Sequence, residues 1–315
     1  MKKKFTTSRK LIATLKAKEI LIKSTRLKWL IEHGCVVTKL YGVIEAQRGQ
    51  IFKDFVIWVS EERRKGDSDI KYAIIGEGAK LVGNSAFGRT GMDKNKHKIV
   101  KFCNEIQFNT AKNNYFFYDA EEYNGGYEVI MKPKQVKQNM PIQIACSVYD
   151  DSKLRMLQFY YDCVDKYINR SDFQYITMDT DSAYMALSND FEKLIKPELR
   201  EQYEKDKYNW FPRPNNGYDK RVPGLFKIEF EGEGMVALCS KSYYVWGEDK
   251  DKVSCKGLKK CTNSEVLNKN MYLKCLVDAE CINGVNRGFR FIEKSLITYE
   301  QQKVGFSQSM LRVWL

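Results

Sequence analysis

Ten residues near the middle of the chain decide the fold: residues 175–184 read Tyr-Ile-Thr-Met-Asp-Thr-Asp-Ser-Ala-Tyr. Apolar residues stand on both sides of the Asp-Thr-Asp-Ser segment, and the apolar run continues through residues 185–187. Two such runs joined by turn-forming residues are typical of a β-hairpin. At the tip of that hairpin, Asp179 and Asp181 can project together from one end of a sheet.

Paired carboxylates at a hairpin tip suit a hard cation. Mg²⁺ takes oxygen ligands, typically one or two carboxylates together with substrate phosphates and water. Two such ions about 3.5–4 Å apart would hold the attacking and leaving oxygens of a phosphoryl transfer. The alternative is a plain Asp-rich turn without a metal, because Asp is a favoured turn residue.

A second motif covers residues 80–88, Lys-Leu-Val-Gly-Asn-Ser-Ala-Phe-Gly. On a helix, Lys80, Asn84 and Phe87 are spaced i, i+4, i+7 and share one face. That face offers a cation for a phosphate group and an aromatic plane for a base or a sugar. An ordinary amphipathic helix with one exposed lysine is the alternative.

A third motif covers residues 240–245, Ser-Lys-Ser-Tyr-Tyr-Val, and a Lys-rich stretch follows at residues 252–260. Lysines interleaved with aromatic residues on a strand suit contact with a nucleic-acid backbone. The candidate contacts are Lys241, Tyr243, Lys256 and Lys259. A solvated basic edge strand is the alternative.

The composition agrees with a polyanionic partner. The chain has 53 Lys and Arg against 40 Asp and Glu, a net charge of +13, which favours nucleic acid. A hydrophobic content of 43% with only six prolines excludes a disordered chain. No run approaches the ~20 apolar residues of a membrane span, and no apolar segment follows the initial Met-Lys-Lys-Lys. We therefore expect an intracellular protein without a membrane partner, in a compartment that the sequence leaves open.

Four of the nine cysteines form a C-x5-C…C-x5-C pattern: Cys255, Cys261, Cys275 and Cys281. Structural zinc sites usually take two ligands from a knuckle with two to four intervening residues. Five intervening residues favour reduced thiols over a zinc site.

Hydrophobic periodicity predicts the order of helices and strands. Helices are predicted over residues 11–33, ending at Gly34, and over residues 52–64, 74–87, 147–168 and 190–206. Strands are predicted over residues 35–46, on both sides of residue 180, and over residues 224–234 and 236–245. Residues 90–125 are predicted to be irregular, and residues 210–217 to form a loop. In the helix over residues 147–168, the predicted apolar face contains Leu154, Leu157, Tyr161 and Val164.

Taken together and in this order, the three motifs resemble the conserved regions of family B DNA polymerases. Those regions are K-x3-N-S-x-Y-G on the fingers helix, Y-x-D-T-D-S in the palm and K-x-Y near the palm–thumb junction. The sequence is most similar to the protein-primed subgroup of viruses, linear plasmids and Polinton/Maverick-type transposons. Residues 28–39, 141–156 and 286–303 add to the likeness, which covers roughly residues 15–306.

The resemblance implies an α+β fold, in which an antiparallel polymerase palm sheet is accompanied by helical fingers and a small thumb. Residues 1–70 would lead into the fingers, and residues 71–100 would hold the fingers helix. Residues 101–246 would form the palm with the Asp-Thr-Asp hairpin. Residues 247–315 would form the thumb, diverging from the family pattern after about residue 306.

The resemblance also implies roles for single residues. Asp181 would be the principal Mg²⁺ ligand, with Asp179 beside it. Lys80 would hold the triphosphate of the incoming nucleotide, and Asn84 and Phe87 would help to form its pocket.

The implied partners are primer–template DNA, a dNTP and a terminal protein primer. Lys241 and Tyr243 would hold the primer terminus, with Lys256 and Lys259 as further DNA contacts. The primer 3′-hydroxyl would attack the α-phosphate and release pyrophosphate, a reaction catalysed mainly by positioning and charge stabilisation.

The sequence departs from the family pattern in several places. Phe87 replaces a tyrosine, and Thr177 stands where the palm motif usually has an aromatic residue. The 315 residues contain no D-x2-S-L-Y-P segment, whose Asp is the other essential metal ligand of the family, and no exonuclease motifs. We therefore expect an N-terminally truncated polymerase that is inactive alone. A non-catalytic DNA-binding remnant and a basic structural protein with chance motifs remain as alternatives.

Overall fold

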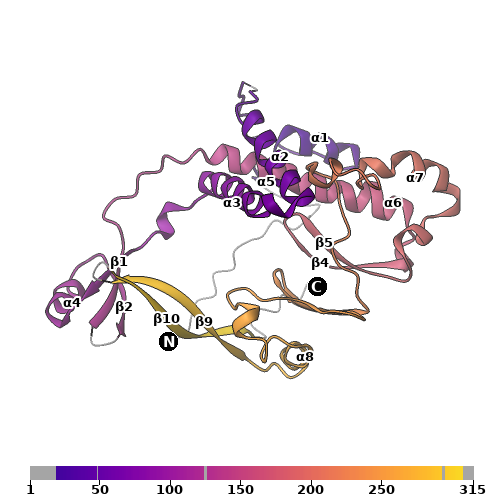
Figure 1. Cartoon of the computed structure of the whole chain (residues 1–315). Helices are drawn as coiled ribbons and strands as arrows, with labels where there is room; N and C mark the ends of the chain where they lie inside the picture. The colour runs from indigo at the N-terminus through magenta and orange to yellow at the C-terminus, as the bar shows by residue number, and fades with distance from the viewer. Residues whose placement is uncertain (1–18, 48, 124–125, 293–294, 308–315) are drawn as a thin grey trace.

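The computed structural model describes residues 19–47, 49–123, 126–292 and 295–307, which fold into helices and antiparallel strands (Figure 1). The α+β class is therefore confirmed. The α-helices are α1 Ser24–Glu32, α2 Lys53–Ser68, α3 Ala73–Thr90, α4 Glu105–Lys112, α5 Ile142–Gln158, α6 Asp165–Tyr167, α7 Arg200–Asp206 and α8 Lys269–Val277. The strands are β1 Ile99–Cys103, β2 Phe117–Tyr123, β3 Gly126–Met131, β4 Phe173–Asp179, β5 Ser182–Leu187, β6 Gly234–Cys239, β7 Ser242–Trp246, β8 Lys252–Ser254, β9 Ile282–Ile292 and β10 Ser295–Phe306.

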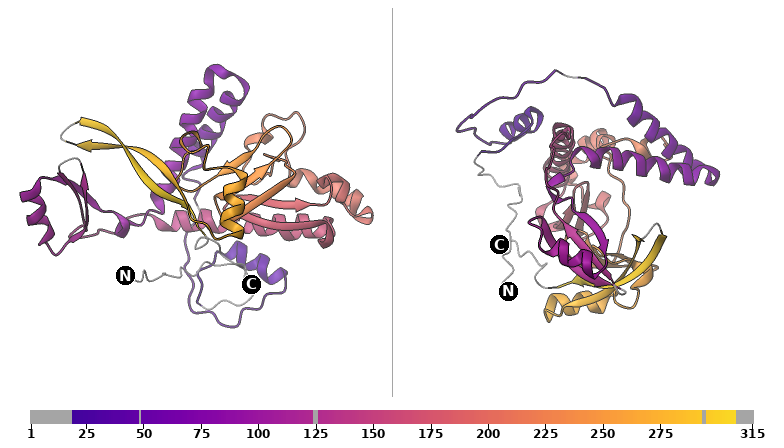
Figure 2. Two further views of the ribbon diagram at one scale, coloured as in Figure 1. Left: turned by 90° about the horizontal axis from the view of Figure 1, so that it is seen from below. Right: turned by 90° about the vertical axis from the view of Figure 1, so that its left-hand side faces the viewer.

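The described strands form four small antiparallel sheets, ordered β1-β3-β2, β4-β5, β6-β7-β8 and β9-β10. The β4–β5 hairpin lies beside the long α5–α6 segment (Figure 1). The β9–β10 hairpin extends away from α8 toward the β1-β3-β2 sheet, and the α2–α3 pair projects from the body on another side (Figure 2). Among the described residues, no helix has both the length and the apolar character that a membrane crossing requires.

One hydrophobic core, the Phe159 core, lies between α5–α6, α7 and the loop before β6. Its buried members are Phe159, Cys163, Val164, Tyr167, Ile168, Ile195, Tyr203 and Trp210. Ala183 and Met185 of β5 pack against it, so the hairpin that carries Asp179 and Asp181 rests on this core. Burial of these aromatic and aliphatic side chains, at about 25 cal/mol per Å² of apolar surface, provides the hairpin with a rigid base.

A separate core, the Tyr272 core, joins the β6-β7-β8 sheet to α8 and to the base of the β9–β10 hairpin. Its buried members are Val236, Leu238, Tyr244, Leu258, Leu267, Tyr272, Cys275, Ile282 and Phe306. Within it, the Tyr272 and Phe306 rings stack with centroids 4.3 Å apart. The two cores share no residue, so the hairpin that carries Asp179 and the hairpin that carries Lys241 pack against different hydrophobic cores.

Helices α2 and α3 approach each other closely at two glycines. A Cβ atom on Gly66 would lie 3.2 Å from the Gly76 Cα atom and 3.1 Å from the Tyr72 carbonyl oxygen. Farther along the pair, a Cβ atom on Gly83 would lie 3.2 Å from a methyl group of Val59. The absence of side chains at Gly66 and Gly76 therefore sets how near the two backbones come.

Helix α1 docks on α5 and the turn after it through polar contacts. The buried Arg26 forms an ion pair with Asp150 at 2.7 Å. Farther along α1, Trp29 Nε1 donates to Asp162 at 2.8 Å, and His33 Nε2 lies 2.8 Å from the other oxygen of the same carboxylate. The helix ends at Glu32, and Gly34, which was predicted to terminate it, follows the His33 cap and adopts φ +88.

Several sequence predictions of secondary structure are confirmed. Helix α2 covers the predicted residues 52–64 and runs on to Ser68, α3 covers residues 74–87, and β4 and β5 flank residue 180. Residues 210–217 form a loop that contains no strand or α-helix. Helix α3 continues past its predicted end at residue 87 to Thr90.

The predicted strand over residues 35–46 is wrong, because this segment has no regular secondary structure and pairs with no described strand. Val36, Val43 and Ile44 are each more than three-quarters exposed. β-Branched residues favour a strand only where neighbouring strands and a covering layer complete it.

The prediction of an irregular segment over residues 90–125 is also wrong, since it contains β1, α4 and β2. Its asparagines include a helix cap: Asn104 and Gln107 form a reciprocal capping box at the start of α4. The two strands on either side of α4 both pair with β3, which lies outside the predicted segment.

Three further predicted elements differ from the structure. Residues 11–18 of the first predicted helix lie outside the described residues, and α1 begins only at Ser24. The helix over residues 190–206 is reduced to α7, because Pro197 favours a chain break before it. Residues 224–233 join no described sheet, while residues 236–245 form two strands that turn at residues 240–241.

The apolar face predicted for residues 147–168 is wrong in register. Val164 is fully buried, but Tyr161 is 40% exposed. A π-helical turn spans Phe159–Val164, and its extra residue rotates the buried face, so that Phe159, Cys163 and Tyr167 point into the core.

Candidate active site

The turn between β4 and β5 holds Asp179 and Asp181 at the tip of the hairpin. Asp179 pairs with Ser182 across the turn, and Thr180 between the carboxylates adopts φ +51. The Asp181 N–H donates to the Asp179 carbonyl at 2.5 Å, which closes a γ-turn-like arrangement around Thr180. A left-handed conformation is rare for a β-branched residue and costs on the order of 1–2 kcal/mol. Such local strain is concentrated at functional sites.

The two carboxylates have different surroundings. Asp179 Oδ2 lies 3.4 Å from the ammonium group of Lys241, and the Asp179 side chain is about one-quarter exposed. Asp181 is exposed, and within the described part of the chain its carboxylate makes no hydrogen bond or ion pair. Asp181 is therefore open to a ligand, whereas Asp179 already balances a lysine.

Lys241 lies at the turn between β6 and β7, on the other sheet. It adopts φ +66, and its carbonyl accepts a hydrogen bond from Ser254 Oγ on β8 at 3.1 Å. Its side chain is 57% exposed. Both hairpin tips thus hold a non-glycine residue in the left-handed region, and one ion pair joins them.

A second link joins the same two hairpins below the tips. Tyr184 on β5 donates its hydroxyl hydrogen to Tyr243 Oη on β7 at 2.7 Å, and their ring centroids are 4.7 Å apart. Tyr243 is only 7% exposed, so its ring has no free face for a base to stack on. Burial, followed by the hydrogen bond with Tyr184, raises the pKa of Tyr243 far above its ordinary value.

The predicted nucleotide-binding residues occupy one stretch of α3. Lys80 pairs with Glu77 at 3.2 Å, and both side chains are largely solvated. Asn84 is exposed, and Phe87 makes an edge contact with Tyr149 of α5 at 5.2 Å. Among the described residues, no hydrogen bond, ion pair or ring contact joins Lys80, Asn84 or Phe87 to either hairpin tip.

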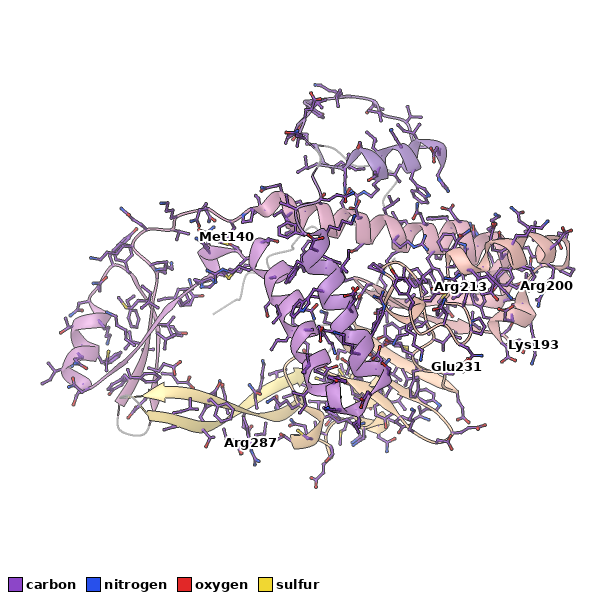
Figure 3. The ribbon with its side chains drawn as sticks, turned by 45° about the horizontal axis from the view of Figure 1, so that its top comes forward. Met140, Lys193, Arg200, Arg213, Glu231 and Arg287 are labelled. Atoms are coloured by element: carbon purple, nitrogen blue, oxygen red, sulfur yellow. The ribbon has the colours of Figure 1, made fainter. Side chains whose placement is uncertain are left out.

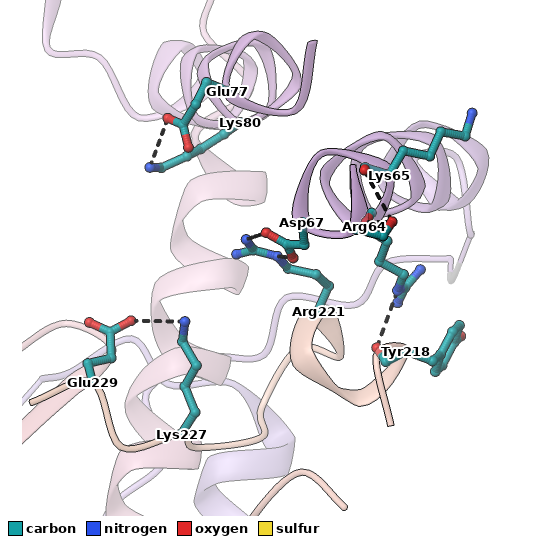
Figure 4. A network of polar contacts seen from close by, with 10 residues as sticks. Arg64, Lys65, Asp67, Glu77, Lys80, Tyr218, Arg221, Lys227 and Glu229 are labelled. Carbon is teal, nitrogen blue, oxygen red and sulfur yellow. Dashed lines mark hydrogen bonds and ion pairs between the residues drawn. The ribbon is translucent and has the colours of Figure 1, made fainter. Parts of the chain in front are cut away.

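The helix pair that carries these residues is fixed to the body by a polar network at the end of α2 (Figure 4). Arg221 makes a two-pronged contact with Asp67, and this hydrogen bonding lowers the pKa of the Asp67 carboxyl. Arg64 donates to the Tyr218 carbonyl at 3.2 Å and stacks on the Tyr218 ring. The network attaches α2 to the loop over residues 218–222, and thereby orients α3.

Lys256 and Lys259 are exposed on a loop that follows β8. Between them, Leu258 is buried in the Tyr272 core. It packs so closely on Gly284 that a Cβ atom added there would lie 2.5 Å from a Leu258 methyl group. The buried Asn263 amide donates to the carbonyls of Lys259 and Val285, at 2.9 and 2.8 Å. The loop is thus anchored from below while its lysines face solvent.

The four cysteines of the C-x5-C pattern have dissimilar environments. Cys275 is buried in the Tyr272 core, Cys255 donates to the Gly305 carbonyl at 3.6 Å, and Cys261 and Cys281 are exposed. Within the described residues, no three His, Cys, Asp or Glu side chains gather closely enough to hold a metal ion.

The absence of a three-ligand cluster among the described residues limits how Mg²⁺ could bind at the β4–β5 hairpin. Asp179 and Asp181 supply hard oxygen donors, the kind Mg²⁺ takes, and Mg²⁺ commonly uses one or two carboxylates with phosphates and water. The donor set therefore fits an ion that is shared with a phosphate substrate. It does not fit an ion that is enclosed by protein ligands alone.

Sequence reasoning missed two features of this region. The first is the contact of Tyr184 with Tyr243. Tyr184 is the last of residues 175–184, and the presence of a tyrosine in both motifs was the only sign of this contact in the sequence. The second feature is a pair of lysines at the edge of the β1-β3-β2 sheet: Lys98 and Lys132 both lie over the Tyr118 ring, at 4.0 and 5.4 Å from its centroid. Because α4 and β2 lie between β1 and β3 in the chain, the sequence alone did not bring these lysines together.

Two open hollows in the described part of the chain lie away from the hairpin tips. One open hollow is lined mainly by residues 262–266 and 283–285, and another by residues around Tyr208, Arg213 and Tyr218. Neither is lined by Asp179, Asp181 or Lys241. In Figure 3, Arg213, which lines the second hollow, lies on the body of the molecule, whereas Arg287 lies on the β9–β10 hairpin.

The chain was compared with protein-family models, with curated proteins and with solved structures, and none of the three comparisons found a match.

Proposed function

We propose that this chain is the fingers, palm and thumb portion of a DNA-directed DNA polymerase of the protein-primed family B type. One observation carries the proposal: Asp179 of the Asp-Thr-Asp-Ser turn and Lys241 of the Lys-Ser-Tyr turn lie 3.4 Å apart, although 62 residues separate them in sequence. A nucleotidyl-transfer site needs carboxylates for metal ions and a cation for the DNA backbone at one place. The two motifs meet as that chemistry requires.

The proposed roles follow from the surroundings of each side chain. Mg²⁺ would supply charge stabilisation to the phosphates when bound. Asp181, exposed and unpaired within the described residues, is the main ligand, and Asp179 is the second. Lys241 exchanges its partly exposed ion pair for a primer phosphate at little cost, because such pairs contribute only about 0–1 kcal/mol.

Lys80 acts in the same way toward the triphosphate of a dNTP. Its pair with Glu77 lies on the solvated face of α3, so release of the ammonium group is also inexpensive. Asn84 and Phe87 follow on the same helix face and would border the nucleotide. A terminal protein primer and primer–template DNA complete the proposed set of partners.

A non-catalytic DNA-binding remnant is the second candidate, and the metal-ligand count favours it. The turn supplies two carboxylates, and no third acidic, histidine or cysteine side chain of the described residues joins them. Two-metal phosphoryl transfer requires ligands for both ions. The remnant would retain the basic surfaces and salt-sensitive DNA binding without chemistry.

Extension of a labelled primer–template by the purified chain, with dNTPs and Mg²⁺, tests the proposal. A working polymerase requires Mg²⁺-dependent addition that Asp181→Asn abolishes, while the matched control Asp190→Asn, at an exposed acid paired with Lys193, leaves it unchanged. Addition that survives Asp181→Asn would refute the assigned site. Absence of addition together with preference for primer–template junctions over blunt duplex would support the remnant, and absence of both would refute DNA binding of this kind.

A further inference from the structure

The contact between the two hairpins has an unusual construction. Strands β4–β5 and β6–β7–β8 belong to different sheets, so no ladder of backbone hydrogen bonds holds one hairpin against the other. Side chains must therefore fix their relative position. Among the described residues, the Asp179–Lys241 ion pair and the Tyr184–Tyr243 hydrogen bond join the β4–β5 and β6–β7 hairpins, and the ammonium group of Lys252 on β8 lies 6.0 Å from the Tyr184 ring centroid.

These two links differ in strength. The ion pair is partly exposed, and exposed pairs contribute about 0–1 kcal/mol and weaken in salt. The tyrosine pair combines a 2.7 Å hydrogen bond with ring contact, and Tyr243 is nearly fully buried. Moreover, the ion pair must open if Lys241 is to bind a phosphate, whereas the tyrosine pair can persist.

The local backbone turns both tyrosines toward each other. Tyr184 pairs with Thr177, directly beside a register shift in β4. Tyr243 pairs with Ala237, directly beside a register shift in β6. A β-bulge bends its strand and re-aims the neighbouring side chains, so a bend in each hairpin lies at the level of the contact.

We propose that Tyr184 is a positioning residue that acts through Tyr243. Its hydroxyl fixes Tyr243, and with it the Lys241 turn two residues earlier, relative to the carboxylates at Asp179 and Asp181. Tyr243 itself, being buried, is a link and not a stacking surface. This inference rests on the proposed function and adds how the DNA-facing cation is held in register with the metal ligands.

The test compares two affinities on the same folded protein. A fluorescent primer–template junction and a blunt duplex of equal length are titrated with the full chain, and the ratio of their dissociation constants is the junction preference. Loss of one hydrogen bond of this kind corresponds to about a fivefold change in affinity. We expect Tyr184→Phe to lower the junction preference about fivefold without weakening blunt-duplex binding. A purely structural destabilisation would affect both DNAs alike.

Two further variants make the result specific. Tyr243→Phe removes the same bond from the other side, so it should lower the preference equally, and the double variant should lower it no further. Tyr175→Phe is the matched control, because Tyr175 lies on the same hairpin and its hydroxyl makes no hydrogen bond with the described residues. It should leave the preference unchanged.

The possible failures are distinguishable. A wild-type junction preference that Tyr184→Phe leaves intact would overturn the positioning role and leave the proposed function standing. Additive losses in the double variant would also overturn it, since the two hydroxyls would then act separately. A wild-type chain without junction preference would overturn the proposed function and this inference together.

Discussion

Replacement of Gly66 by alanine tests the close approach of α2 and α3, because two effects of opposite sign compete there. Alanine in place of glycine inside a helix ordinarily stabilises a protein by about 0.5–1 kcal/mol. At Gly66, however, the new methyl group would lie 3.1 Å from the Tyr72 carbonyl oxygen and 3.2 Å from the Gly76 Cα atom. Both neighbours are backbone atoms that cannot rotate away.

Overpacking of this kind typically costs about 1–3 kcal/mol. The overpacking term is the larger, so Gly66→Ala should lower the free energy of unfolding by about 0.5–2 kcal/mol. Urea unfolding followed by circular dichroism measures the change. Gly78→Ala in α3 is the matched control, because a methyl group there meets no atom within 4 Å, and it should stabilise the chain.

A double variant sharpens the prediction. Gly66→Ala with Gly76→Ala places two methyl groups at the same contact, so the loss should exceed the sum of the single losses. If Gly66→Ala stabilises the chain as much as Gly78→Ala does, the helices are not held at this distance and the reasoning fails.

Three other variants or reagents test separate parts of the structure. Partial burial opposes the charged form of His33, but hydrogen bonds with the Trp29 carbonyl and Asp162 outweigh it and raise the pKa of His33 above 6.5. The resulting stabilisation is complete below pH 6.5 and is lost as pH rises through the raised pKa, so His33→Gln should flatten the dependence of the melting temperature on pH between pH 5.5 and 8. An unchanged pH dependence would contradict the docking of α1. Leu258→Ala should lower the free energy of unfolding, measured in urea, by about 2–5 kcal/mol. The control Leu81→Ala, at an exposed position, should lower it by less than about 0.5 kcal/mol. Equal losses for the two variants would contradict the anchoring of the loop by Leu258. Burial raises the pKa of Cys163 to about 12, so mass spectrometry should find this thiol unmodified by iodoacetamide at pH 8 until the chain is unfolded, and rapid native modification would contradict its burial.

The sequence was most informative where local pattern and final structure coincide. The β4–β5 hairpin was predictable because its apolar runs and its turn residues are contiguous, and α2 and α3 because helical hydrogen bonds are local. The turn at Ser240 and Lys241 was missed, since the pair lacks the Asn-Gly or Asp-Gly signal of a two-residue hairpin turn.

The remaining errors arise from tertiary structure. The segment over residues 35–46 has strand-forming residues but no described partner strand, and a strand's stability depends on that partner. The β1-β3-β2 sheet shows the opposite case, because β1 and β2 lie in a segment rich in Asn and Lys but both find a partner strand in β3. The π-turn at Phe159–Val164 shifted a correctly predicted helix by one residue.

For the candidate site, the sequence indicated which residues to examine but not how they are held. The ion pair between Asp179 and Lys241 was not predicted, because the two turns belong to different sheets and no local pattern joins them. The tyrosine link could not be predicted, because it depends on two register shifts that no local pattern specifies.

The separation of the Phe159 core from the Tyr272 core has a consequence for local unfolding. Regions with their own cores can open as independent cooperative units, at a free energy below that of global unfolding. Asp179 belongs to the first unit and Lys241 to the second, so their meeting exists only while the units stay docked. The contact between Asp179 and Lys241 would therefore be lost in a partly opened state in which the buried aromatic rings of both cores remain in place. Amide hydrogen exchange would detect this opening under conditions in which the chain as a whole remains folded.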